Sequence, residues 1–259
     1  MAGDIAANAA TAAELVRRTD ARVVVLPEKF LSGYEPDLIA SDPATYAVSP
    51  GDPRLAPIAD ACRETGTVAI VGAATRSDDE LFISSLVFGT GGDVIARYDK
   101  QFLFGGERKL FQPGRSGCTI EVDGWRLGLG ICYDCGFPEH ARAAATAGAH
   151  AYLVSALFSV GNGFHESRTW LPARALDNTA YVLLSNHVGT TGGWNACGSS
   201  AIWGPDGRII AQAGPDETTV ITAELDPAHL VAVRRAEPLL EDVAVPDPQA
   251  ISSRTTVSA

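Results

Sequence analysis

Three side chains with chemistry of their own each follow an apolar run of the chain. Glu28 comes after the run 23–26, Lys100 follows a second such run, and Cys132 comes after 127–131. Functional sites of α/β folds usually lie where strands end. A cysteine at a strand-to-helix turn lies beside backbone amides that can bind an oxyanion, and a carboxylate can accept its proton. The three residue types together suit nucleophilic catalysis, but on spacing and composition alone a buried cysteine and two surface charges are the commoner explanation.

The elements expected to position these residues alternate between strands and helices. The chain opens with a helix that Asp4 caps and that continues to Arg18, and Gly66 is placed to end a second helix. That second helix is expected over 53–64, further helices over 138–147, 165–177 and 227–234, and strands over 23–26, 68–74, 81–88, 94–98, 125–131, 151–155, 181–185, 199–203, 208–211 and 219–224. Several neighbouring strands pair through tight turns, which favours a layered α/β fold with mixed sheets.

No linker and no fixed-period repeat divides the chain, so one domain over 1–259 is predicted. From about residue 236 the tail is expected to be extended. The small polar residues 252–259 are expected to be poorly ordered unless a partner chain holds them.

Composition narrows the classes of partner and compartment. The net charge of −11 argues against binding to nucleic acid or to anionic membrane surfaces. No apolar run reaches the 18 or more residues of a membrane span, and the first residues do not resemble a signal peptide. Five unevenly spaced cysteines do not form the pattern of a disulfide framework. These features predict a cytoplasmic protein.

Four segments resemble the signature segments of the nitrilase superfamily of carbon–nitrogen hydrolases, and they occur in the same order as in that superfamily. They are Leu-Pro-Glu-Lys-Phe-Leu-Ser-Gly-Tyr at 26–34, Tyr-Asp-Lys-Gln-Phe-Leu-Phe at 98–104, Gly-Glu-Arg-Lys-Leu-Phe-Gln-Pro-Gly at 106–114 and Gly-Ile-Cys-Tyr-Asp-Cys-Gly-Phe-Pro-Glu at 130–139. The similarity continues through 174–178 and 198–200 to roughly residue 234. Four matched segments in register are much more specific than a single motif.

The resemblance implies a role for each matched residue. Cys132 is the nucleophile, and Glu28 is the general base that accepts its proton. Lys100 and the backbone N–H of Tyr133 stabilise the oxyanion. Glu107 orients the lysine and the substrate and shares in proton transfer. The reaction runs through a thioester and needs neither a metal nor an organic cofactor.

Residues next to the nucleophile favour amides as the substrate class. Tyr133-Asp134 resembles the amidase and omega-amidase branches, whereas family nitrilases more often carry Trp-Glu after the cysteine. A small aliphatic amide, hydrolysed to a carboxylic acid and ammonia, is therefore expected, with N-carbamoyl amines and nitriles as open alternatives. An acyl-group pocket is expected among four aromatic residues that could equally be core: Tyr34, Phe104, Phe158 and Trp194.

Three other functions compete with this interpretation. Cys132 and Cys135 form a C-x-x-C motif, which is typical of thiol oxidoreductases. His165 or His187 could instead pair with the cysteine in a Cys–His hydrolase. A binding protein without activity could retain the scaffold. The presence of all four matched residues argues against that: Glu28, Lys100, Glu107 and Cys132.

The resemblance also implies the architecture: a four-layer α-β-β-α sandwich that forms a homodimer or a larger assembly. Chains of the family usually begin with a strand that precedes the segment 3–8 of this sequence. Either the start of this sequence is misplaced or that first strand is absent, and its absence would leave backbone groups unpaired at a cost of several kcal/mol. A version extended upstream is therefore predicted to melt at a higher temperature.

Overall fold

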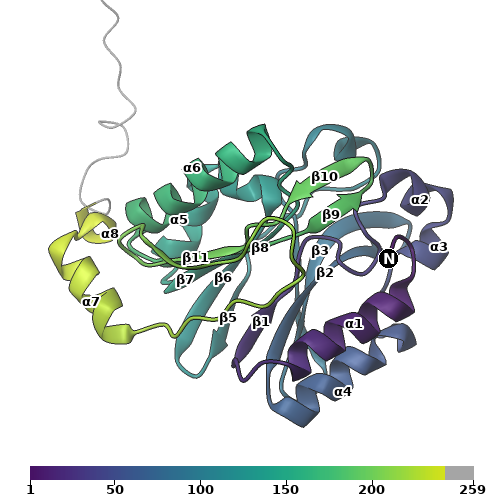
Figure 1. Ribbon diagram of the computed structural model, residues 1–259, viewed down its shortest axis with the longest axis horizontal. Helices are drawn as coiled ribbons and strands as arrows, with labels where there is room; N and C mark the ends of the chain where they lie inside the picture. The colour runs from purple at the N-terminus through teal and green to yellow at the C-terminus, as the bar shows by residue number, and fades with distance from the viewer. Residues whose placement is uncertain (243–259) are drawn as a thin grey trace, which may run out of the picture.

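Two β-sheets packed face to face form the centre of the molecule, and helices cover the outer side of each sheet (Figure 1). The computed structural model describes residues 1–242. The first sheet has the order β1-β2-β3-β4, with β1 parallel to β2 and the other neighbours antiparallel. Its strands are β1 (Val23–Val25), β2 (Val68–Ser77), β3 (Glu80–Phe88) and β4 (Val94–Asp99). Helices α1 (Ile5–Arg17) and α4 (Ala56–Thr65) cover it (Figure 1).

The second sheet has the order β12-β11-β8-β7-β6-β5 and is also mixed. Strands β6, β7 and β8 run parallel, whereas the pairs towards both edges are antiparallel. Its strands are β5 (Thr119–Val122), β6 (Trp125–Ile131), β7 (Ala151–Ala156), β8 (Tyr181–Asn186), β11 (Ala201–Trp203) and β12 (Ile209–Gln212). Helices α5 (Pro138–Thr146) and α6 (Asn162–Asn178) cover its outer face (Figure 1). The predicted α-β-β-α sandwich with mixed sheets is therefore confirmed.

Both faces of each sheet are apolar because each sheet is covered on both sides. Successive side chains of a strand point to opposite faces. Ile70 and Leu153 accordingly lie in the cluster between the two sheets. Their neighbours Val71 and Val154 pack outward, Val71 in the cluster with α1 and α4 and Val154 in the cluster with α5 and α6.

Helix ends follow the capping residues of the sequence. The Asp4 side chain accepts a hydrogen bond of 3.0 Å from the backbone N–H of Ala7 at the start of α1. Gly66 ends α4 in the left-handed conformation, with φ of 68°. Among the described residues, no helix combines the length and the hydropathy that a membrane crossing requires.

Several short elements were not expected from the sequence. They are the helices α2 (Pro36–Ser41) and α3 (Pro43–Tyr46), strand β5, and the hairpin of β9 (Val188–Thr191) and β10 (Trp194–Cys197). Three 3₁₀ turns also occur: η1 (Pro53–Leu55), η2 (Gly105–Lys109) and η3 (Cys132–Gly136). After α7 (Pro227–Ala236) the chain forms a short helix α8 (Leu239–Asp242), so the expectation of an extended tail from about residue 236 is wrong there. The predicted disorder of 252–259 lies outside the described residues.

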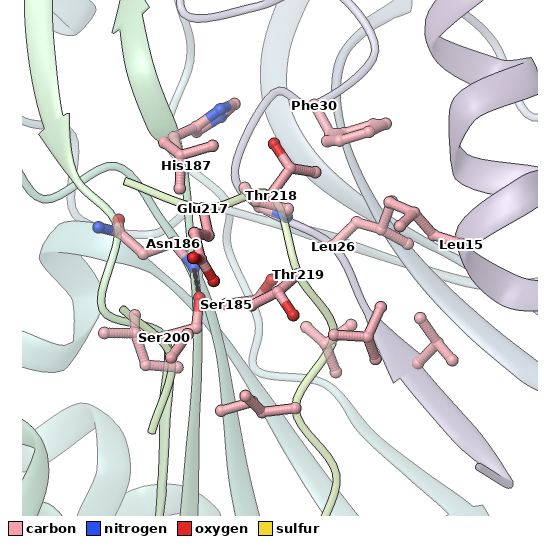
Figure 2. Close-up of a pocket in the computed structure, with 18 of the residues that line it drawn as sticks. Leu15, Leu26, Phe30, Ser185, Asn186, His187, Ser200, Glu217, Thr218 and Thr219 are labelled. Carbon is pink, nitrogen blue, oxygen red and sulfur yellow. Dashed lines mark hydrogen bonds between the residues drawn. The ribbon is translucent and has the colours of Figure 1, made fainter. Parts of the chain in front are cut away.

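The strand predicted over 219–224 is not formed, and a cavity explains why. Residues 218–223 make no backbone–backbone hydrogen bond with any described residue. They line a cavity of about 450 Å³, whose opposite wall includes β1 and Leu15 (Figure 2). Within residues 1–242, β1 pairs only with β2, and no strand precedes α1. Among the described residues, the predicted strand therefore has no neighbouring strand with which to form hydrogen bonds.

Candidate active site

Three of the four residues matched by resemblance follow the ends of strands from both sheets, and the fourth lies in a 3₁₀ turn. Glu28 lies in the turn after β1, and Lys100 follows β4 directly. Glu107 belongs to η2, and Cys132 is the first residue of η3, directly after β6. The large cavity of Figure 2 is elsewhere, because none of these four residues lines it.

Lys100 joins the two glutamates through its ammonium group. Its Nζ atom lies 2.8 Å from Glu28 Oε1 and 2.8 Å from Glu107 Oε2. Glu28 and Lys100 have no exposed surface and Glu107 is 3% exposed, so all three charges are buried. The backbone N–H of Phe104 and the hydroxyl of Tyr34 also donate to Glu107. The alternative that Glu28 and Lys100 are ordinary surface charges is therefore wrong.

The pKa values of the two glutamates are shifted in opposite directions. Burial raises the pKa of Glu28, and the charge of Lys100 only partly offsets this. Burial also opposes the ionisation of Glu107, but the charges of Lys100 and Lys29 with two hydrogen bonds outweigh it and lower the pKa of Glu107. Lys100 keeps its proton, because the two carboxylates raise its pKa despite burial. Glu28 is therefore the carboxylate suited to accept a proton, while Glu107 stays ionised.

Cys132 occupies a strained turn between the two sheets. Its backbone φ is 45°, a left-handed conformation that is uncommon for a residue with a side chain. The thiol lies 3.6 Å from the carbonyl oxygen of Leu157. Burial raises the pKa of Cys132 well above its usual range, the charges of both glutamates add to this, and Lys100 opposes it. The resting thiol is therefore protonated and needs a base.

Asp134 holds this turn, and sequence reasoning used it only as a mark of the branch. Its carboxylate accepts hydrogen bonds from the N–H of Ile131 at 3.0 Å, the N–H of Phe102 at 2.8 Å and the hydroxyl of Tyr98 at 2.7 Å. Asp134 is fully buried. A carboxylate that binds the residue before the nucleophile fixes the position of Cys132. The sequence signal for this role is an acidic residue two positions after a strand-end cysteine.

The expected oxyanion donor is close to the start of a helical turn. Tyr133 is the second residue of η3, and the first N–H groups of a helical turn have no partner within it. Its ring packs edge-on against Phe104 and Phe137, with ring centroids 5.3 and 5.1 Å apart. The N–H of Tyr133 is therefore available in the manner that an oxyanion site requires.

The four aromatic residues expected to form a pocket are not equivalent. Phe104 and Trp194 are 43% and 42% exposed, and their ring centroids are 6.4 Å apart. Tyr34 is buried in a small cluster with Leu157 and Ala196. Phe158 packs against α6 in the core of the second sheet. The first three remain candidates for the pocket, whereas Phe158 lies where the core alternative places it.

The contacts of the competing residues give the other functions little support. Cys135 is a free thiol that is buried in the cluster beneath α5 and α6. His165 is exposed on α6. The Nε2–H of His187 donates to the backbone carbonyl of Glu28 at 2.6 Å, and burial lowers the pKa of His187 to about 4. His187 is thus a neutral residue that holds the turn containing Glu28.

Comparisons with known proteins agree with this arrangement. A family model described as carbon–nitrogen hydrolase matches residues 1–235. A Pseudomonas protegens protein, named as the hydrolase in the pqqF 5′ region, is 39% identical over 207 residues, which are 78% of this chain and 71% of the relative. An omega-amidase of Saccharomyces cerevisiae is 30% identical over 256 residues, which are 91% of this chain and 87% of the relative.

Solved structures show the same relationship. A Saccharomyces cerevisiae protein from branch 10 of the nitrilase superfamily has a TM-score of 0.82 at 30% identity, over 91% of this chain and 90% of that one. A variant of the amidase from Nesterenkonia sp. AN1, with the acetamide moiety of fluoroacetamide covalently added at its active-site cysteine, has a TM-score of 0.70 at 30% identity, over 82% of this chain and 79% of that one. The chain therefore belongs to the carbon–nitrogen hydrolases of the nitrilase superfamily and groups with their amidase branch.

Proposed function

We propose that this protein hydrolyses a small aliphatic amide to a carboxylic acid and ammonia, with Cys132 as the nucleophile. The observation that carries the proposal is the buried ammonium group of Lys100, which both Glu28 and Glu107 hold at 2.8 Å. A fixed cation beside a strand-end thiol suits the stabilisation of a developing oxyanion.

The first half of the reaction transfers the acyl group to sulfur. Glu28 accepts the thiol proton of Cys132 as the sulfur attacks the amide carbon. The resulting oxyanion is stabilised by Lys100 and by the backbone N–H of Tyr133. Glu28 then donates its proton to the amide nitrogen and the carbon–nitrogen bond breaks. Ammonia departs, and the acyl group remains on Cys132 as a thioester.

The second half releases the acid. Glu28, again ionised, takes a proton from a water molecule, whose oxygen attacks the thioester carbon. The same cation and N–H stabilise the second oxyanion. When this adduct collapses, the carbon–sulfur bond breaks, the thiolate takes up the proton from Glu28, and the acid dissociates. Glu107 orients Lys100 throughout and does not have to change its charge.

The surroundings of the thiol favour a small neutral acyl group. Leu157, whose carbonyl oxygen lies next to the thiol, packs with Tyr34 and Ala196 in one apolar cluster. Apolar walls of this kind discriminate by size and shape. Amidases among the relatives are consistent with the substrate class, including an (R)-stereoselective amidase of Pseudomonas sp. that is 31% identical.

The test is a comparison of ammonia release from aliphatic amides, omega-amides, N-carbamoyl amines and nitriles, with the Cys132→Ala variant as the blank. We expect turnover of short aliphatic amides by the native protein and none by the blank. Turnover restricted to N-carbamoyl amines or to nitriles would replace the proposed substrate. Equal rates for the native protein and the blank would remove the proposed nucleophile.

A further inference from the structure

Lys29 is a second buried lysine beside the site, and the reaction described above does not use it. Its side chain has no exposed surface, and its Nζ atom has no hydrogen-bond partner among the described residues. The residue has a backbone φ of 47°, so its place in the turn after Glu28 is held against conformational preference. A buried ammonium group without a hydrogen bond is costly and needs an explanation.

The surroundings of this ammonium group are aromatic on one side and acidic on the other. Its Nζ atom lies 3.3 Å from the ring centroid of Tyr34 and 5.2 Å from that of Phe111. It lies 3.8 Å from Glu107 Oε1. The same oxygen accepts hydrogen bonds from Tyr34 and from Lys100. Lys29 therefore faces Glu107 from the side of the aromatic rings, where cation–π attraction favours its charged form.

A count of charges shows what this placement does. Glu28 and Glu107 carry two negative charges, and Lys100, which contacts both, supplies one positive charge. With Lys29 charged, the buried group is neutral. Without that charge, the group would hold one uncompensated carboxylate, and a buried carboxylate in that position takes up a proton.

We propose that Lys29 is a positioning residue, the second counter-ion of Glu107, and that its charge keeps the carboxylate pair ionised so that Glu28 can accept the thiol proton. This inference rests on the proposed function of Glu28 as the base. The charged and titratable groups that act on Lys29 are Glu28, Glu107, Lys100 and Cys132, and Lys29 in turn acts on His187. Burial lowers the pKa of Lys29 to about 8, and the two carboxylates oppose this, so the group is charged at neutral pH.

The test measures the rate at which iodoacetamide alkylates Cys132 as a function of pH, which requires no turnover. Mass spectrometry of the peptide that contains Cys132 separates this thiol from the other cysteines. Lys29→Met removes the charge and keeps the length of the side chain, whereas Lys29→Arg keeps the charge. Lys109→Met is the matched control, because it removes an exposed lysine from η2, the turn that carries Glu107.

On the acid side of the profile the alkylation rate rises with pH, and we call this rise the acid limb. We expect the acid limb to shift to higher pH by about one unit or more in Lys29→Met, the usual effect of losing a neighbouring opposite charge. Lys29→Arg and Lys109→Met should keep the limb within a few tenths of a unit of its native position. A lower rate at every pH, with the limb unmoved in Lys29→Met, would show a merely structural role and overturn the proposal.

Amide hydrolysis by the same variants separates this inference from the proposed function. A moved alkylation limb without hydrolysis of any amide would retain the role of Lys29 and reject the function. Hydrolysis with an unmoved limb would do the reverse. If Lys29→Met does not fold, NMR of the native protein with ¹³C-labelled lysine side chains decides, because an uncharged Lys29 at pH 7 would contradict the proposal.

Discussion

The ammonium group of Lys100 and the carboxylate of Glu28 are 2.8 Å apart, and neither side chain has any contact with solvent. Each charge is tolerated in the interior because the other is there. The pair joins the end of β4 to the turn after β1, which are the two outer strands of the first sheet. The site is therefore tied to the packing of that sheet.

Removal of Lys100 should cost stability as well as activity. In Lys100→Met the two carboxylates lose their shared cation, and breaking a buried ion pair from one side typically destabilises a protein by about 3 to 5 kcal/mol. Urea unfolding of the native protein and the variant measures the difference. Lys109→Met, which removes an exposed lysine, should unfold at nearly the native urea concentration. Equal midpoints for the native protein and Lys100→Met would show that the pair contributes nothing to stability.

Asp134 should control the position of the nucleophile. In Asp134→Asn the amide nitrogen replaces a carboxylate oxygen that accepts hydrogen bonds, so at least one buried donor loses its partner. The loss of a hydrogen bond to a charged acceptor costs about 1.5 to 3 kcal/mol. We expect kcat to fall by about tenfold or more with a smaller change in KM, because the turn that holds Cys132 shifts.

Asp123→Asn is the control for that substitution, since Asp123 lies in a surface turn and pairs with the exposed Arg22. Its kinetic constants should match those of the native enzyme. Native kinetics in Asp134→Asn, measured alongside it, would mean that the carboxylate does not position the thiol.

His187 should make the protein less stable in acid. Burial lowers its pKa to about 4, whereas an unfolded histidine titrates near 6.5. Between these values the unfolded chain binds more protons than the folded one. The contribution of His187 to the free energy of unfolding is therefore fully present above pH 6.5 and is lost as the pH drops towards 4. The contribution of this one group is at most about 3 kcal/mol, at 1.36 kcal/mol per pKa unit.

The comparison with His187→Gln isolates that contribution from other titrations. A glutamine side chain can donate to the backbone carbonyl of Glu28 but does not titrate. Unfolding free energies at pH 7 and pH 4 should therefore differ less in the variant than in the native protein. The same loss of stability in both proteins would show that His187 is not the group responsible.

Much of the fold was predictable because its strands carry local signals. The run of Trp125–Ile131 has the predicted bounds, and Asp4 and Gly66 mark helix ends as expected. The hairpin of β9 and β10 was missed even though Gly192 and Gly193 mark its turn, because each of its strands has only four residues. The helices that start at Pro36 and Pro43 have no periodicity to detect, since each has at most six residues.

The parts of the site that sequence could not supply depend on contacts between distant segments. Glu28 and Lys100 look like surface residues in their own segments, and only the order of strands in the first sheet brings them together. Lys29 is buried for the same reason, against the ring of Tyr34 and beside Glu107. The segment 219–224 is an opposite case. Its local sequence suits a strand, but no strand forms there, because no neighbouring strand among the described residues pairs with it.

The most direct test of the central claim is to quench the enzyme in acid during turnover of a short aliphatic amide and to locate the acyl group by mass spectrometry. We predict that the acyl group is found on Cys132 as a thioester that hydroxylamine releases. Cys135→Ser, which changes the neighbouring thiol, should retain the adduct and substantial activity, and Cys132→Ala should lose both. An acyl group on any other residue, or turnover that persists in Cys132→Ala, would contradict the account.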